Sequence, residues 1–464
     1  MTAGPVRERV EGDVNTSSAR SAWARAHLGG RGRDLVEADS RVFLRQSLST
    51  PVLNAVSGAR GIYLEDVDGR RYMDFHGNSV HHLGYAHPKV IEAVKNQLDE
   101  LSFTPRRYTN RRAVELAEKL SEITPGRLER SLFAPSGSDA IEMALKLARL
   151  ATGRFKTVSF WDAFHGAGFG ASSVGGEELF RGGRLGPLLS GAEHVAPPEC
   201  YRCAYGYPDT DGQPRLDLCH MSCASYIRYI LEREDDVAAV VAEPIRTVPI
   251  IPPPGFWTEV RQACDDHGAL LIFDEIPNGL GKTGRMYSCE HYETTPDIVV
   301  TGKALGGGVV PIAAITATPE LDVGGERAIG HYTHEKNPIL AAAALATISV
   351  IEEEGLVEHA TALGRHVERT LEELKSAHRL VGDVRNKGLL MGIELVSDPE
   401  TKARADVEAE RVLYRSLELG LSFKTTMGSV LTLTPPLVVT EGELDRAFGI
   451  VDQALTEIEA TTLH

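Results

Sequence analysis

The feature that most constrains the fold is a repeated alternation of short apolar runs with longer amphipathic segments. Apolar runs of four to six residues, rich in Val, Ile, Ala and Phe, occur at 155–160, 237–242, 269–273, 298–301 and 312–316. Helical patterns at 88–101 and 114–123 precede these runs. Buried strands separated by helices are typical of a mostly parallel sheet covered on both faces. The sequence therefore predicts an α/β fold.

The pattern changes after Asn337-Pro338. Helical patterns and strand patterns then alternate less regularly, at 339–353, 356–377, 388–395, 405–418, 430–434 and 441–458. This texture indicates a smaller α+β domain. We expect an N-terminal segment at 1–85 that is partly a flexible tail and partly belongs to the small domain, a large domain at 86–337 and a small C-terminal domain at 338–464.

Charge and hydropathy exclude several classes of partner. The 464 residues carry 49 basic and 65 acidic side chains, a net charge of −16. A surface this acidic argues against broad binding to nucleic acids or anionic membranes. The N-terminal region lacks the apolar core of a secretory signal, and the longest apolar run, 339–346, is too short to span a bilayer. We expect a cytoplasmic protein that acts on a small molecule.

Two charged residues end neighbouring strand candidates. Asp274 follows the apolar run 269–273, and Lys303 follows 298–301 and precedes Gly306-Gly307-Gly308. Open α/β sheets bind ligands at the carboxyl ends of their strands. A buried aspartate there needs a cationic partner, such as a pyridinium nitrogen. Taken alone, a lysine at a glycine-rich turn and an acid that caps a turn are equally simple explanations.

Two further segments fit a planar, phosphorylated ligand. Ser136-Gly137-Ser138-Asp139 opens a helical pattern, and free N–H groups at a helix N-terminus bind phosphate. Phe164 precedes His165-Gly166 after the 155–160 strand and offers an aromatic plate. Each signal is weak alone, because Ser-Gly-Ser-Asp is also a good N-cap and a Phe before a turn is common in cores.

The segment 279–284, Gly-Leu-Gly-Lys-Thr-Gly, matches a dinucleotide-binding fingerprint in letters only. It follows Asp274-Glu275, whose carboxylates would repel a pyrophosphate, and no clear helix begins at Gly284. We interpret it as a glycine-rich turn.

In their order along the chain, these segments resemble the class III pyridoxal-phosphate-dependent aminotransferases. The motifs of this resemblance are Ser136-Gly137-Ser138, Phe164-His165-Gly166, Glu243-Pro244, Asp274-Glu275-Ile276, Lys303 with Gly306-Gly307-Gly308, and Thr333 with Asn337-Pro338. The resemblance covers about residues 45–460. It implies fold type I, with a mostly parallel seven-stranded sheet in the large domain and a smaller α+β C-terminal domain. It also implies a homodimer with active sites at the interface, and pyridoxal 5′-phosphate as cofactor.

The resemblance assigns roles residue by residue. Lys303 is expected to be the Schiff-base lysine and proton shuttle, and Asp274 to hold the pyridine nitrogen. Phe164 and Ile276 are expected to sandwich the ring. Gly137 and Ser138 are expected to bind the phosphate through backbone N–H groups, and Thr333 to reach it from the other subunit.

The chain departs from the family pattern at three places. Thr432 stands where transaminases of the family carry the arginine that grips the carboxylate of the keto acid, and a hydroxyl cannot replace that bidentate contact. Pro277 and Arg246 each replace a customary glutamine. These departures indicate elimination rather than transamination.

The stretches 76–82 and 331–338 resemble the branch of the family that eliminates ammonia from hydroxylated aminophosphonates. The resemblance implies conversion of (R)-1-hydroxy-2-aminoethylphosphonate to phosphonoacetaldehyde and ammonia, with Arg106 and Lys424 as candidate grips for the dianionic head group. His334 or His81 is a candidate acid for the leaving hydroxide. The alternative is a transaminase for an ω-amine or ω-amino acid, with Arg246 or Arg106 binding the acceptor's carboxylate.

Four of the six cysteines lie in one Gly/Pro/Asp-rich insertion. They form a Cys200-x2-Cys203 pair and a Cys219-x3-Cys223 pair separated by fifteen residues. Such spacing is compatible with a tetrahedral zinc site, with His220 as a substitute ligand. Similar cysteine-bearing loops occur in relatives in which a metal is not assumed, so a structural metal is left open. We expect no metal in the catalytic site, because pyridoxal phosphate already supplies the electrophile.

Overall fold

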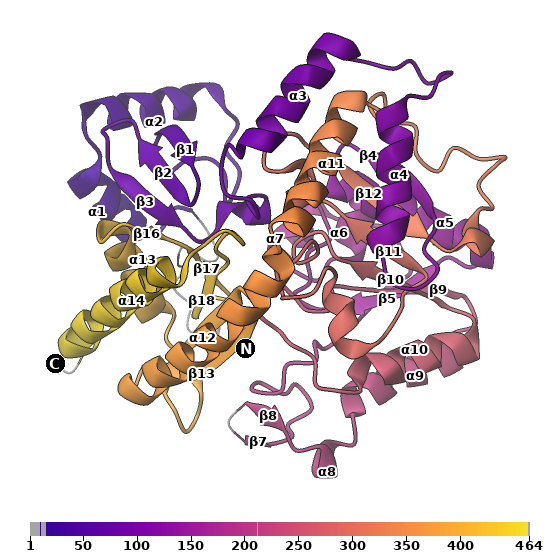
Figure 1. The fold of residues 1–464 in the computed structure, drawn as a ribbon. Coiled ribbons are helices and arrows are strands. Elements are labelled where there is room, and N and C mark those ends of the chain that lie inside the picture. Colours follow the sequence, from indigo (N-terminus) through magenta and orange to yellow (C-terminus); the bar gives the residue numbers. More distant parts are fainter. Residues whose placement is uncertain (1–9, 11–14, 211, 463–464) are drawn as a thin grey trace. The chain divides into compact units, whose positions relative to one another are not determined.

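A computed structural model describes residue 10, residues 15–210 and residues 212–462. The chain forms two compact units (Figure 1). We call residues 78–361 the large unit, and the residues up to 77 together with those from 362 onward the small unit. The domain limits expected from the sequence, 85/86 and 337/338, stay a prediction.

The large unit is built on a seven-stranded sheet in the order β4-β12-β11-β10-β9-β5-β6. Its strands are β4 (Arg130–Ala134), β5 (Lys156–Phe160), β6 (Ala192–Val195), β9 (Val237–Ala242), β10 (Leu270–Asp274), β11 (Ile298–Thr301) and β12 (Ala313–Ala317). The five strands from β6 to β11 run parallel, whereas β12 is antiparallel to both of its neighbours. The prediction of a mostly parallel α/β sheet is therefore confirmed. The sequence analysis missed β4 and β6, whose exposed polar residues hide the apolar pattern.

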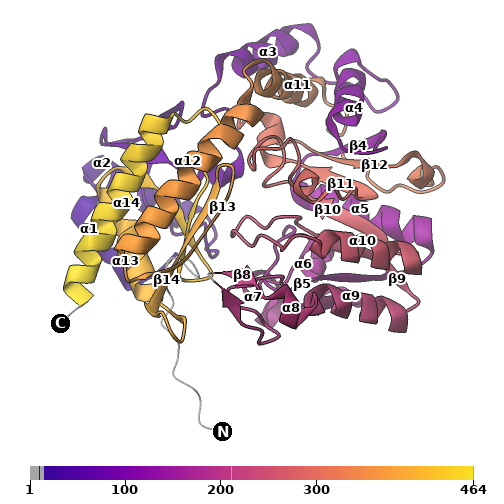
Figure 2. The ribbon, with the colours of Figure 1, turned by 60° about the horizontal axis from the view of Figure 1, so that its bottom comes forward.

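Helices cover both faces of this sheet. On one face α9 (Ser222–Arg233) and α10 (Phe256–His267) bury a core around Trp257 (Figure 2). On the other face α5 (Gly137–Thr152) and α6 (Phe169–Val174) bury a second core around Ile141. Elsewhere in the unit, α11 packs against α3 and α4. The remaining elements of the large unit are α3 (Pro88–Glu100), α4 (Arg111–Ile123), α7 (Glu178–Arg181), η2 (Gly183–Leu185), β7 (Asp209–Thr210), β8 (Gln213–Pro214), α8 (Leu216–Cys219), η3 (Ser288–Tyr292), η4 (Lys303–Gly306), η5 (Pro319–Leu321) and α11 (Pro338–Glu353).

The small unit contains two sheets. One has the order β1-β2-β3-β16, and the other, β13-β14-β18-β17, is antiparallel with β15 on its edge. Its strands are β1 (Val56–Arg60), β2 (Tyr63–Asp66), β3 (Arg71–Asp74), β13 (Val381–Lys387), β14 (Leu390–Asp398), β15 (Ala403–Arg404), β16 (Leu421–Ser422), β17 (Lys424–Thr426) and β18 (Val430–Leu433). Its helices are α1 (Ser18–His27), α2 (Gly30–Val42), α13 (Asp406–Glu418) and α14 (Glu441–Thr462), while α12 (Leu356–Ala377) and η1 (Gly77–Ser79) cross the limits of the two units.

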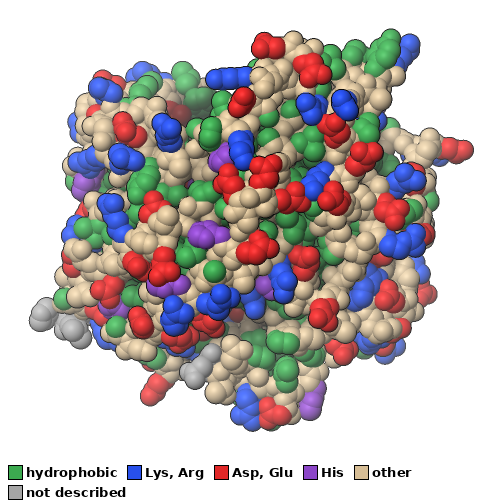
Figure 3. Space-filling view, viewed as in Figure 1, with side chains coloured by type: hydrophobic (Ala, Val, Ile, Leu, Met, Phe, Trp, Pro, Cys, Tyr) green, Lys and Arg blue, Asp and Glu red, His purple; other side chains and the backbone are tan. Residues whose placement is uncertain are grey.

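The N-terminal segment that we expected to be partly flexible contains helices α1 and α2, and its residues 1–9 and 11–14 lie outside the described part. Within the described residues, no helix is both long and apolar enough to cross a membrane. Acidic and basic side chains alternate over the face in Figure 3, without one large patch of a single sign.

Candidate active site

A buried carboxylate lies at the carboxyl end of β10. Asp274 is 2% exposed and accepts two hydrogen bonds: the backbone N–H of Ile276 lies 3.0 Å from Oδ1, and Nδ1 of His165 lies 2.8 Å from Oδ2. These donors compensate for the water that the carboxylate loses on burial. Because a carboxylate has about four lone-pair positions, Asp274 can still accept a further cationic donor.

Lys303 follows the neighbouring strand, β11. Strands β10 and β11 pair in parallel with Asp274 opposite Val300, so both residues end at the same edge of the sheet. Lys303 has φ of 43°, in the left-handed region that costs a non-glycine residue roughly 1–2 kcal/mol. Strain of this kind persists where the surroundings fix one side-chain direction, and it is frequent at functional sites.

Burial and nearby acids act on the Lys303 amine in opposite directions. Burial lowers its pKa, while the charges of Glu243, Asp274 and Glu177 raise it. Burial is the larger cause, so the net pKa lies below that of an exposed lysine. A lysine with a lowered pKa is a better nucleophile and proton acceptor near neutral pH.

The N-terminus of α5 lies beside the segment that follows β10. Ser136 caps the helix by accepting from Asp139 N, and the N–H groups of Gly137 and Ser138 precede the intrahelical hydrogen bonds. A Cβ on Gly137 would lie only 2.8 Å from Cδ1 of Ile276, and a Cβ on Gly166 only 2.3 Å from Oγ of Ser138. The helix end thus contacts the residues that follow β5 and β10, which is suited to an anion near Asp274.

The two expected ring contacts come from the same loops. Ile276, two residues after Asp274, is 8% exposed. It packs against Gly137 and also against Gly302, where an added Cβ would lie 3.3 Å from the Ile276 side chain. Phe164 precedes His165, and its half-buried ring lies 4.5 Å from that of Phe180. Both side chains are thereby tied to the segments that hold Asp274.

This arrangement fits pyridoxal 5′-phosphate. It combines an amine, a buried acceptor for the ring nitrogen, an anion-binding helix end and two apolar side chains. Nε2 of His165 is buried with no hydrogen-bond partner among the described residues, so the Asp274–His165 pair has unused hydrogen-bonding capacity. The roles of Gly137, Ser138, Phe164, Asp274, Ile276 and Lys303 remain proposals, but the fold brings all six residues together.

Three further predicted residues lie on other segments of the chain. Thr333 is exposed, one residue after Tyr332, whose hydroxyl donates to Asp139 O at 3.4 Å. Arg106 is exposed and lies 3.5 Å from Glu335. Lys424 lies on β17 of the small unit.

Arg246 and Thr432 have clear local partners. Arg246 is 7% exposed, and its guanidinium lies 2.7 Å from Glu177 and 3.9 Å from Glu243. Thr432 is fully buried in the small unit, with Oγ1 2.7 Å from Oγ1 of Thr426.

The sequence analysis gave no role to His165 or Glu177. His165 stood in a recognised motif, but its bond to Asp274 joins residues 109 positions apart. Glu177 lies between short elements, and no motif in the sequence around it predicts that its charge raises the pKa of Lys303.

Comparison with known proteins agrees with this geometry. The profile of the class-III aminotransferases matches residues 45–455. The chain is 44% identical to (R)-1-hydroxy-2-aminoethylphosphonate ammonia-lyase of Vibrio splendidus, over 97% of this chain and 95% of the relative. It is 36% identical to the leucine/methionine racemase of Thermococcus litoralis, over 92% and 96%.

Among solved structures, the PLP-bound amine transaminase from an uncultivated Pseudomonas species superposes with a TM-score of 0.83 at 28% identity, over 90% of this chain and 99% of that one. Its fold is that of the PLP-dependent transaminases, fold type I, as predicted. The chain therefore belongs to the class-III aminotransferase family, and its cofactor is pyridoxal 5′-phosphate.

Proposed function

We propose that this enzyme is an ammonia-lyase that converts (R)-1-hydroxy-2-aminoethylphosphonate to phosphonoacetaldehyde and ammonia. The observation that carries the proposal is the 44% identity, over 97% of the chain, with a lyase of that name. Thr432 supports it, because a buried threonine paired with Thr426 offers no cation for the carboxylate of a keto acid. A lyase needs no second substrate of that kind.

Lys303 is the base of the proposed reaction. Pyridoxal 5′-phosphate, when bound, supplies an electron sink for the charge left when the carbon bearing nitrogen loses its proton. Burial favours the neutral Lys303 amine that accepts this proton. Glu243, Asp274 and Glu177 then stabilise the ammonium that forms.

The remaining steps need an acid and water. Hydroxide leaves from the carbon bearing phosphorus and takes up a proton, which gives water. Water then hydrolyses the enamine to the aldehyde and ammonia, so the overall reaction consumes no water and changes no electron count. His334 is the better candidate acid: Nδ2 of Asn337, 3.1 Å from His334 Nδ1, donates to that nitrogen and leaves the proton on Nε2. His81, the other candidate, is fully buried beside Tyr85.

Arg106 and Lys424 are proposed to bind the phosphonate dianion. Arg106 is exposed beside Glu335, which keeps its side chain in place without burying it. Replacing Arg106 by alanine is expected to raise KM at least about tenfold with a smaller change in kcat. An unchanged KM would remove Arg106 from the substrate site.

One assay separates the lyase from the alternative, an ω-amine or ω-amino acid transaminase, which the family also supports. The holoenzyme is incubated with (R)-1-hydroxy-2-aminoethylphosphonate without any keto acid, and ammonia is counted per active site. The lyase releases ammonia over many turnovers at a rate that added pyruvate does not change. Release that ends after one equivalent and resumes with pyruvate contradicts the proposal. Arg246, the alternative's carboxylate grip, is already paired with Glu177 and Glu243.

We also infer a homodimer with Thr333 near the partner's cofactor. The exposure of Thr333, beside a Tyr332 that is anchored on α5, supports this placement. Light scattering on the holoenzyme tests the mass, and Thr333→Val is expected to weaken cofactor retention in the dimer. A monomer with full activity would contradict the inference. A cytoplasmic location stays a prediction.

A further inference from the structure

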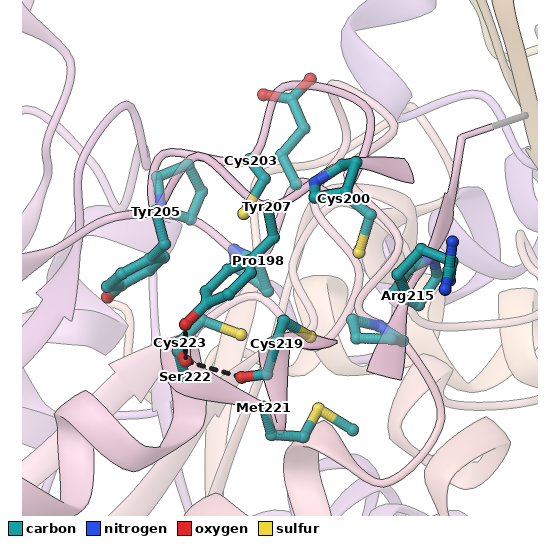
Figure 4. A pocket seen from close by; sticks show the side chains of 15 residues that line it. Pro198, Cys200, Cys203, Tyr205, Tyr207, Arg215, Cys219, Met221, Ser222 and Cys223 are labelled. Atoms are coloured by element: carbon teal, nitrogen blue, oxygen red, sulfur yellow. Dashed lines mark hydrogen bonds between the residues drawn. The ribbon is translucent and has the colours of Figure 1, made fainter. Parts of the chain in front are cut away.

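Four cysteine side chains point toward one cavity of the large unit (Figure 4). Cys200 and Cys203 lie on the turn that follows β6. Cys219 ends α8, and Cys223 lies in the first turn of α9. All four are partly buried and none is in a disulfide. Two chain segments separated by fifteen residues therefore bring their thiols to one place.

The cavity is small and its wall is largely apolar. Its volume of about 30 Å³ corresponds to roughly one water molecule. The lining shared with the thiols comes mainly from proline and tyrosine, namely Pro197, Pro198, Pro208, Pro214, Pro253, Tyr205 and Tyr207. A space of this size suits a single ion held by the thiols.

The backbone around the second cysteine pair is strained. His220 and Met221 both adopt left-handed conformations, with φ of 43° and 54°. Each costs a non-glycine residue roughly 1–2 kcal/mol. These two residues form the turn between Cys219 and Cys223, both of which line the cavity. His220 ends α8 in this conformation, and its backbone N–H donates to Leu216 O.

A polar contact joins the two turns. Oγ of Ser222 lies 2.6 Å from the carbonyl oxygen of Cys219 and 3.1 Å from the hydroxyl of Tyr207 (Figure 4). On the first turn, Gly206 N donates to Cys203 O at 3.0 Å. The cysteine-bearing segments are thus connected before any ion binds.

We propose that Cys200, Cys203, Cys219 and Cys223 bind one structural zinc ion with tetrahedral thiolate coordination. The Cys-x2-Cys and Cys-x3-Cys spacing is that of closed zinc sites. Among the described residues, only His366, Glu441 and Asp445 bring three potential ligand atoms within 4.8 Å of one another. The four thiols therefore stand further apart than in a closed tetrahedral site. Zinc would therefore draw the two turns together. The segment between β6 and α9 has only short elements, β7, β8 and α8. The ion would therefore stabilise this segment by cross-linking its two cysteine pairs.

The test measures metal on the purified holoenzyme. We expect about one zinc per chain by elemental analysis after dialysis in reducing buffer. Replacing it by cobalt(II) should give the strong visible bands of tetrahedral thiolate coordination. Four thiols should react with a thiol reagent only after a chelator removes the ion. Less than about a tenth of an equivalent after incubation with zinc, a Cys200–Cys223 disulfide in the reduced sample, or stoichiometric iron in place of zinc would each overturn the proposal.

Variants localise the ion. Cys200→Ser and Cys223→Ser are each expected to lower the zinc content from about one to below about a tenth of an ion per chain. Cys264→Ala is the matched control, because Cys264 is fully buried in α10 and does not line the cavity. If the serine variants fail to fold, the cobalt spectrum of the unmodified chain still decides. Zinc retained by both serine variants would overturn the assignment.

Discussion

His165 and Asp274 form a hydrogen bond in the interior of the large unit, with 2.8 Å between Nδ1 and Oδ2. Both side chains are nearly inaccessible to solvent. The bond places the proton of the neutral imidazole on Nδ1 and fixes one oxygen of the carboxylate. His165 therefore positions Asp274 for the ring nitrogen of the cofactor without touching the substrate.

The first prediction concerns this positioning. In His165→Asn, the Asn Nδ2 can replace Nδ1 as donor, so we expect less than about a tenfold loss in kcat/KM. In His165→Leu the donor is lost, and we expect on the order of 100-fold, with weaker cofactor binding and a shifted pH profile. Kinetics from pH 6 to 9 and cofactor titration measure both. Equal losses in the two variants, with unchanged pH profiles, would reduce His165 to a packing residue.

The second prediction concerns Lys303. Lys303→Ala is expected to lower ammonia release at least about 10⁴-fold, because the nucleophile and proton acceptor are removed together. Borohydride reduction of the unmodified holoenzyme should fix the cofactor's mass on the peptide that contains Lys303. Lys282 is the internal comparison, because it is also buried and burial lowers its pKa to about 7. A label on Lys282 would contradict the assignment.

The third prediction concerns Glu275, the neighbour of Asp274. Its carboxylate accepts from Ser288 Oγ at 2.7 Å and from Cys289 N at 2.8 Å, and burial raises its pKa to about 7. Between pH 4.5 and 7 the folded state keeps a proton that the unfolded state loses. The free energy of unfolding therefore falls as pH rises through this window, by about 3 kcal/mol in total.

Glu275→Gln removes this dependence and can keep both hydrogen bonds. We expect it to match the unmodified chain near pH 4.5 and to exceed its stability by about 3 kcal/mol at pH 8. Urea unfolding across this pH range measures the difference. Glu293→Gln, at an exposed neighbouring position, should leave the slope unchanged. Identical slopes for Glu275→Gln and the unmodified chain would show that Glu275 ionises normally.

The sequence predicted the elements whose pattern is local. Strand β9 (Val237–Ala242) is apolar at every position and buried throughout. In the same way, the apolar run before Asp274 predicts where β10 ends. Strand β4 was missed because Arg130 and Leu132 face solvent, and it joins the sheet only through β12. An edge strand of this kind is specified by its neighbour rather than by its own residues.

The candidate site likewise contains some features that the local sequence specifies and others that only the tertiary structure specifies. The types of residue at 274 and 303 and the glycines after Lys303 could be recognised by order along the chain, because a motif is a local feature. The bond between Arg246 and Glu177 could not, since it joins residues 69 positions apart and depends on how the segment after α6 folds. Spatial partners of motif residues need the tertiary structure.

The last prediction tests whether Thr432 belongs to the substrate site. Its hydroxyl lies 2.7 Å from that of Thr426, and both residues are buried in the small unit. Thr432→Val leaves the Thr426 hydroxyl without its partner, so we expect a loss of about 1–2 kcal/mol in unfolding free energy. In the double variant Thr426→Val/Thr432→Val both hydroxyls are gone, and most of this loss should be recovered. Ammonia release without keto acid should stay within about twofold in both variants, because neither hydroxyl is needed for elimination. A large drop in kcat/KM with unchanged stability in Thr432→Val would place Thr432 in contact with the substrate, and the argument from the missing arginine would then fail.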